Sequence, residues 1–349
     1  MCIRDRNMIA YIWVNFNRNK SLADKYLLIL AEKRLTYHAV FAKFITGTAV
    51  NRRSFMQYIE ILKKSILLMR RLAALTLAAF MTFLSVLTLG IDALSAGKRH
   101  PEVSKVNVLL IGAAERSQGI TTDGKYYYFS SKWGLTKSEL DGKTRVKSNP
   151  LAIPQQLKDD YGLAHIGGIS YSKADNCIYA GLEDSKVWKY PVVAVYDADT
   201  LKFTGRYYIL DNTRHTRGLP WVAVDNDNGL LIALDHSKNA NELIFYDIVD
   251  NMKYVKTVKL SETVKSIQGA EMYKGMLYAA TNNDTQAIYK IDPVSGEVSK
   301  YFDRNLTKGS EGEGITVLET EDGAVFHAID MGPLFINAFI RSYAPVEEG

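Results

Sequence analysis

The feature that most constrains the fold is a short phrase that recurs five times after residue 115. Each copy is a glycine followed by an apolar residue, a short strand pattern and a tight turn. The glycines are Gly119, Gly168, Gly218, Gly269 and Gly314, at intervals of 49, 50, 51 and 45 residues. The turns are Asp123-Gly124, Asp175-Asn176, Asn228-Gly229, Lys274-Gly275 and Asp322-Gly323. Asp-Gly and Asn-Gly pairs favour hairpins because they tolerate positive φ. The chain therefore repeats a β-hairpin unit.

Further strand patterns follow each turn. A second and a third strand are present in all five units, and the first four units add a fourth strand. Four antiparallel strands at a period near 50 predict an all-β chain folded as a β-propeller of five blades. A sixth blade would require degenerate strands within residues 143–164. The stretch "VSKVNVLLIG" (103–112) precedes the first unit and is predicted to supply the missing strand of the last blade, which would close the ring.

The N-terminal part of the chain has a different character. Residues 69–96 contain two arginines, the charge-free apolar run 72–91, and small residues near Ser95. This layout predicts a signal peptide, or an uncleaved anchor because 20 apolar residues can span a bilayer. Residues 1–68 precede a well-placed start at Met69. Their opening "MCIRDR" resembles adapter-derived translation, which predicts that this extension is an artefact. A basic amphipathic cytoplasmic segment is the alternative.

Charge and cysteine content describe the predicted domain, residues 97–349. It holds 29 Lys and Arg against 33 Asp and Glu, a net charge of −4, so no nucleic-acid partner is expected. Cys177 is its single cysteine, so its stability must come from its core rather than from a disulfide. We expect a monomer outside the cytoplasm, secreted or held to the membrane by its N-terminal helix.

Polar residues gather where the inner strands of the predicted blades would begin. Each repeated glycine would lie at the crowded axis, and the residues around it would line one mouth of the central channel. A small molecule or a peptide is the partner expected there. The predicted ligand-binding residues are Arg116, Gln118, Trp133, His165, His215, Arg217, Gln268 and Glu313.

Catalytic and metal-binding roles are predicted for an overlapping set. The catalytic candidates are Glu271, Glu313, His165 and His215. A metal site is a second interpretation, because oxygen ligands converging on the axis would suit calcium. Its candidate ligands are Glu271, Asn282, Glu313 and Asp330. No spacing requires the metal, and no cofactor is otherwise indicated.

The first and fourth repeats resemble a known family. "RSQGITTDGKYYYFSSKWGLTKSEL" (116–140) and "GAEMYKGMLYAATNNDTQAIYKIDPVSGEV" (269–298) are similar to the plant and bacterial glutamine cyclotransferases. The resemblance implies a five-bladed propeller that cyclises N-terminal glutamine. The family's acid falls on Phe129, however, and a phenyl ring cannot transfer a proton.

Two classes of function therefore stay open. In the first, the chain is an exported propeller that binds a ligand at the channel mouth and has diverged from the cyclotransferases. In the second, it is an enzyme at the same mouth. That enzyme would be a glutaminyl cyclase with a relocated acid, or a calcium-dependent hydrolase of the lactonase and arylesterase kind.

Overall fold

The computed structural model describes residues 52–95, 97–184, 188–235 and 241–346. Most of the doubtful extension, residues 1–51, lies outside this range. The chain divides into two compact units, one that ends at Leu84 and one that spans Ser85–Gly349. The boundary falls within the long helix α2 (Arg52–Asp92). Within α2, the segment Ile59–Asp92 is long enough and apolar enough to cross a membrane.

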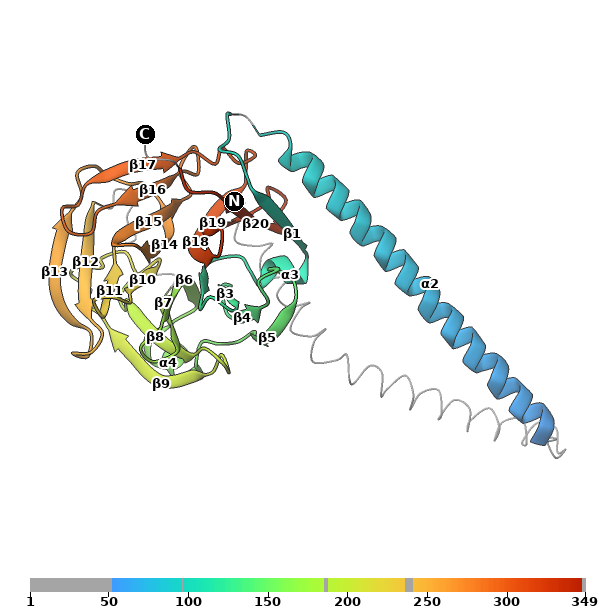
Figure 1. Cartoon of the computed structure of the whole chain (residues 1–349). Coiled ribbons are helices and arrows are strands. Elements are labelled where there is room, and N and C mark those ends of the chain that lie inside the picture. The colour runs from blue at the N-terminus through green and yellow to red at the C-terminus, as the bar shows by residue number, and fades with distance from the viewer. Residues whose placement is uncertain (1–51, 96, 185–187, 236–240, 347–349) are drawn as a thin grey trace. The chain divides into compact units, whose positions relative to one another are not determined.

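The second unit contains five four-stranded antiparallel sheets arranged around a centre (Figure 1). Blade 1 contains β2 (Ile120–Thr122), β3 (Tyr127–Ser130), β4 (Leu135–Ser138) and β5 (Arg145–Asn149). Blade 2 contains β6 (His165–Ser172), β7 (Cys177–Glu183), β8 (Val192–Asp197) and β9 (Phe203–Ile209). Blade 3 contains β10 (Val222–Asp225), β11 (Leu230–Ala233), β12 (Glu242–Asp247) and β13 (Lys253–Lys259). Blade 4 contains β14 (Ile267–Tyr273), β15 (Met276–Thr281), β16 (Ile288–Ile291) and β17 (Val298–Phe302).

Blade 5 combines three strands from the C-terminal end of the repeat region with one strand from its N-terminal end. It contains β18 (Glu311–Thr320), β19 (Gly323–Met331), β20 (Asn337–Tyr343) and β1 (Ser104–Leu109). β1 precedes all the blades in the sequence and pairs antiparallel with β20, with Val106 opposite Ile340. The chain is thus a five-bladed β-propeller in which every blade has four strands.

Two short helices interrupt the strands. α3 (Ile111–Ala114) follows β1, and α4 (Gln155–Tyr161) lies between blades 1 and 2. Residues 143–164, where a sixth blade would have to lie, contain only β5 and α4 among their regular elements. Leu157 of α4 packs into the core between blades 1 and 2.

The core lies between neighbouring blades. In blade 2, β7 and β8 are buried along almost their full length, whereas the outer strand β9 is mostly exposed. A middle strand is covered on both faces because each blade packs face to face against the next. The continuous apolar sequences of the middle strands, including Cys177, follow from this two-sided burial.

Glycines allow the inner strands to approach closely at the axis. A Cβ atom on Gly314 would lie 2.9 Å from the Cα atom of Gly119, and one on Gly269 would lie 2.7 Å from the Cα atom of Gly314. A Cβ atom on Gly119 would lie 3.0 Å from the Cα atom of Gly168. Real Cβ atoms do not tolerate contacts this short, so the close approach of the blades requires glycine here.

Gly218 is not part of this ring, which corrects the alignment of the third repeat. Its place next to Gly168 is taken by Trp221, whose Cβ atom would lie 2.5 Å from a Cβ atom on Gly168. Trp221 is fully buried and packs in the core between blades 3 and 4. Gly218 has a φ of 92° and lies beside Trp188 in the preceding loop. The phrase "HTRGL" therefore marks a turn three residues before the axial position.

Candidate functional site

Three blades contribute to a connected polar cluster where their inner strands begin. The Nε2 atom of His165 lies 2.7 Å from Oε1 of Gln118, and its Nδ1 atom lies 3.2 Å from Oε2 of Glu183. The Nε2 atom of Gln118 donates to Oε1 of Glu313 at 3.5 Å and to the carbonyl oxygen of Ser117. We call Gln118, His165, Glu183 and Glu313 the mouth cluster. It joins blades 1, 2 and 5.

Strand pairing explains how two members of the mouth cluster meet. His165 begins β6 and Glu183 ends β7, and the two residues are directly opposite in the antiparallel register. Opposite side chains on one face of such a pair lie within contact distance. The sequence places Glu183 at the mouth, after the second strand of its repeat, but it was not among the predicted catalytic, ligand-binding or metal-binding residues. The Asp175-Asn176 turn was a signal for it, because folding the hairpin there brings positions 165 and 183 together.

The exposure of these side chains differs within the cluster. The His165 side chain is 25% exposed, whereas that of Glu183 is 4% exposed. Glu313 is also buried, and Gln118 is half-buried. His165 and Gln118 are therefore the members of the cluster that an incoming molecule can reach, whereas the two carboxylates are nearly enclosed.

Aromatic residues flank the mouth cluster. A Cβ atom on Gly218 would lie 2.6 Å from the ring of Trp188 and 2.7 Å from Oε1 of Glu183, so the indole lies near the acidic side of the cluster. Trp133, a predicted ligand residue, is half-buried in the loop after β3, and Nζ of Lys132 lies 5.3 Å from its ring centroid. The carbonyl oxygen of Lys132 accepts a hydrogen bond from the backbone of Ile166, which brings this loop beside the start of β6.

Two predicted site residues have structural environments instead. The guanidinium of Arg116 is buried and donates to the carbonyl oxygens of Gly142, Gly112 and Lys143. His215 is fully buried, with Nδ1 at 3.2 Å from the Leu234 carbonyl oxygen and Nε2 at 2.8 Å from the Tyr246 hydroxyl. Burial lowers the pKa of His215 to about 4, so it is neutral near pH 7. Neither side chain is accessible to a ligand.

The remaining predicted ligand residues lie outside the mouth cluster's hydrogen bonds. Arg217 is exposed, and its backbone N–H donates to Oδ1 of Asp235 at 2.7 Å. Gln268 is half-buried in β14, and its carbonyl oxygen lies close to Gly168. Both belong to the same set of loops and strand starts as the cluster.

Glu271 lies deeper along the axis, on the inner strand of blade 4. Its Oε2 atom accepts hydrogen bonds from the hydroxyls of Thr121 at 3.3 Å and Thr316 at 3.4 Å, which belong to blades 1 and 5. Burial raises the pKa of Glu271 to about 8, and the two hydroxyls act in the opposite direction without overcoming it. A carboxyl group that is protonated near neutral pH thus bridges three inner strands.

The four predicted metal ligands do not converge. Asp330 forms a buried ion pair with Arg341 at 2.6 Å, and Oδ1 of Asn282 accepts from the backbone N–H of Gly312 at 3.1 Å. Glu271 and Glu313 have the separate partners described above. Within the described ranges, no group of three or more His, Cys, Asp or Glu side chains is placed to hold a metal ion. The geometry therefore gives no support to the calcium interpretation.

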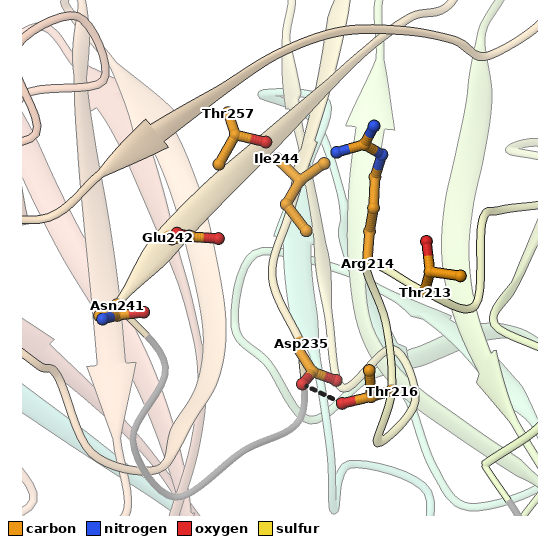
Figure 2. A pocket seen from close by; sticks show the side chains of 8 residues that line it. All are labelled: Thr213, Arg214, Thr216, Asp235, Asn241, Glu242, Ile244 and Thr257. Atoms are coloured by element: carbon orange, nitrogen blue, oxygen red, sulfur yellow. Dashed lines mark hydrogen bonds between the residues drawn. The ribbon is translucent and has the colours of Figure 1, made fainter.

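A cavity of about 280 Å³ lies in blade 3 (Figure 2). The Arg214 side chain lies at one end, and Asp235, which accepts a hydrogen bond from Thr216 at 2.8 Å, lies at the other (Figure 2). Glu242, Asn241 and Ile244 complete its sides together with Thr213 and Thr257. It provides a second polar location against which binding at the mouth can be tested.

The comparisons with known proteins agree with a repeat architecture and assign no activity. The four-stranded units and the axial ring define a five-bladed β-propeller. A family described as a repeat of unknown function (DUF6923) matches residues 165–317, which run from blade 2 into the inner strand of blade 5. No curated protein matches the sequence.

One solved structure with similarity to the chain is hydrazine synthase from Kuenenia stuttgartiensis. The identity is 13% and the TM-score is 0.38, over 67% of this chain and 59% of that chain. The chain thus spans less than two thirds of that structure's length, and a likeness this distant says nothing about activity. None of these matches names the glutamine cyclotransferases, so that resemblance stays a prediction.

Proposed function

We propose that this protein is an extracytoplasmic β-propeller that binds a small molecule or a peptide at the mouth cluster. The observation that carries the proposal is the hydrogen-bonded series Glu183, His165, Gln118 and Glu313, drawn from three blades. Polar side chains that converge from separate blades on a rigid scaffold are typical of ligand sites. Arg116 and His215 are buried, which supports this series over those two members of the predicted set.

The chemistry of the mouth cluster suits a ligand with a protonated amine. Two carboxylates with little exposure, Glu183 and Glu313, lie on either side of Gln118 and His165. The indole of Trp188 lies next to Glu183, and aromatic faces attract ammonium groups. The N-terminal ammonium of a peptide, or a small primary amine, would combine with these features.

Localisation outside the cytoplasm rests on α2. The segment Ile59–Asp92 can cross a membrane, and the positive charges Lys63, Lys64, Arg70 and Arg71 precede its most apolar part. Positively charged flanks are retained on the cytoplasmic side. The propeller, which follows the helix, would then lie on the opposite side of the membrane.

Replacing Glu183 with glutamine is expected to weaken amine binding by about 10–100-fold, because a charge-assisted hydrogen bond contributes roughly 1.5–3 kcal/mol. The measurement is calorimetric titration of the full chain in detergent with glycylglycine and with its N-acetylated form. Only the free amine should bind. The control variant is Glu242→Gln in the blade 3 cavity, which should leave the affinity unchanged. Loss of binding in Glu242→Gln, but not in Glu183→Gln, would place the ligand in the cavity and refute binding at the mouth.

An enzyme at the same mouth is the second candidate, and a specific contact favours it. Glu183 holds Nδ1 of His165, an arrangement that orients an imidazole for proton transfer. Phe129 occupies the position of the catalytic acid in the glutamine cyclotransferases. It is fully buried, and its phenyl ring cannot transfer a proton. In a cyclase reaction the α-amine of glutamine would displace Gln118 from Nε2 of His165 and bond to the side-chain amide carbon. Nε2 of His165 would accept the amine proton and return it to the amide nitrogen, which would leave as ammonia.

This second candidate predicts ammonia release from peptides with N-terminal glutamine. The variant His165→Gln should lower kcat by about 100-fold, the typical contribution of a general base. Glu319→Gln, at the exposed end of β18, is a matched surface control and should be fully active. Peptide binding without any release of ammonia would exclude the cyclase and leave the binding function.

A further inference from the structure

The end of the apolar helix is part of the propeller's compact unit. Residues Ser85–Asp92, the last two turns of α2, belong to the unit that contains all five blades. Oγ1 of Thr88 accepts a hydrogen bond from the Asn107 side chain of β1 at 2.9 Å. Oγ1 of Thr307, in the loop before β18, donates to the carbonyl oxygens of Ile91 and Asp92 at 3.2 Å each. The Thr307 hydroxyl thus serves backbone carbonyls that the end of a helix otherwise leaves without partners.

Asp92 is buried within this contact. Its carboxylate is 3% exposed and pairs with Arg341 at 2.7 Å and with Lys105 at 2.6 Å. A third cation, Arg99, lies 3.3 Å away. Burial favours the neutral acid, but the hydrogen bond and charge of Arg341, together with Lys105 and Arg99, hold the pKa of Asp92 well below its usual range. Asp92 is therefore ionised.

Arg341 is the centre of the network and has no exposure to water. Its Nε atom pairs with Asp330 at 2.6 Å, and its Nη1 atom pairs with Glu102. With Asp92 present, three carboxylates face three cations: Asp92, Glu102 and Asp330 against Arg99, Lys105 and Arg341. Without Asp92, the same site would hold three cations and two carboxylates. An uncompensated charge in a buried site is strongly destabilising.

We propose that the apolar helix is retained in the finished protein as an uncleaved membrane anchor, and that Asp92 joins it to blade 5. A cut at the small residues near Ser95 would discard Asp92 and leave Arg341 without one of its carboxylates. A helix that is destined for removal has no reason to supply a buried charge to the domain that remains. The exposed apolar side chains of the preceding segment then have a permanent partner, the lipid bilayer. The inference is independent of the proposed ligand.

The first test is the N-terminus of the wild-type chain made in a secreting bacterial host. Membranes are washed with alkaline carbonate, and the protein is mapped by mass spectrometry of its peptides. The expected result is a membrane-bound protein whose peptides include Asp92 and residues that precede it. A soluble protein, or one whose N-terminus falls at residues 94–97, would overturn the proposal.

The second test asks whether Asp92 stabilises the propeller. The variant Asp92→Asn should lower the Tm of the full chain in detergent by about 5–10 °C, because it removes one carboxylate from the balanced network. The control is Asp227→Asn, an exposed turn residue of blade 3, which should leave the Tm within about 1 °C. An unchanged Tm in Asp92→Asn would mean that the helix end contributes nothing to the domain and would contradict the proposal. The N-terminal mapping does not depend on how well this variant folds.

Discussion

Replacing Gly314 with alanine is expected to destabilise the propeller by about 3 kcal/mol, which corresponds to a loss of roughly 6–12 °C in Tm. A Cβ atom at this position would lie 2.8 Å from the backbone nitrogen of Ile120 and 2.9 Å from the Cα atom of Gly119. Both are backbone atoms of the neighbouring blade, so no side-chain rotation can relieve the collision. The inner strands of blades 5 and 1 would have to move apart. Thermal unfolding of the full chain in detergent, followed by circular dichroism, measures the effect.

The control for this substitution is Gly124→Ala. Gly124 has a φ of 86° in the first hairpin turn, and a Cβ atom there would meet no heavy atom within 4 Å. We expect a loss of only about 1–2 kcal/mol, the cost of left-handed backbone for a residue with a Cβ atom. If both variants lost the same stability, the close approach of blades at the axis would not be the reason for glycine at position 314.

Replacing Glu271 with glutamine is expected to change how stability depends on pH. Because burial raises the pKa of this carboxyl from 4.5 to about 8, the unfolded chain loses its proton at a lower pH than the folded chain does. Folded protein therefore loses stability as the pH rises from about 4.5 to 8. Glutamine keeps the acceptor for Thr121 and Thr316 but does not ionise, so the variant should avoid this loss.

At pH 8 the Glu271→Gln variant should be more stable than the wild type by roughly 2–4 kcal/mol, and near pH 4 the two should be equal. The full pKa shift of Glu271 would correspond to about 5 kcal/mol of unfolding free energy. The side chain is partly exposed, however, and this reduces the cost of its charge. Urea unfolding at pH 4, 6 and 8 measures the difference. Glu319→Gln, in the exposed part of β18, is the control and should follow the wild type at every pH. A constant difference across the pH range would contradict the assignment of the raised pKa.

Two buried histidines act in the opposite direction in the wild type. Burial lowers the pKa of His215 and of His327 to about 4, so the unfolded chain binds protons that the folded chain does not between pH 4 and 6.5. Their contribution to stability is present above pH 6.5 and is lost as the pH falls. The histidines lower the stability of the fold as the pH falls, and Glu271 lowers it as the pH rises. The free energy of unfolding should therefore be greatest at an intermediate pH, and the Glu271→Gln variant should shift that pH upward.

The histidines also show which part of the candidate site could be predicted. His165 and His215 occupy similar places before their repeated glycines, and the sequence assigned both to the mouth. His165 pairs across a hairpin with Glu183, and a quarter of its side-chain surface is exposed to solvent. His215 is buried beside Tyr246. The difference follows from the third repeat, where Trp221 rather than Gly218 reaches the axis. The repeated sequence pattern by itself could not show that the axial position of the third repeat lies three residues after its glycine.

Arginine residues illustrate the same limit. Arg116 was expected at the mouth, but its guanidinium is surrounded by backbone carbonyls of the β4–β5 turn and α3. Arg341 was not singled out at all, although it lies at the centre of a buried ion network in blade 5. Arginine is usually exposed, so its burial depends on partners that come from distant parts of the chain.

The sequence by itself determined the five repeated units, their four-stranded blades and the apolar N-terminal helix. These features depend on strand alternation, turn chemistry and hydrophobic length, which are set by residues close together in the chain. Only the tertiary structure decided which polar side chains meet at the mouth and which are enclosed between blades. Burial of a strand end depends on what packs beside it. In blade 5 this includes its own strand β1 and the end of α2, both more than 200 residues before β20 in the sequence.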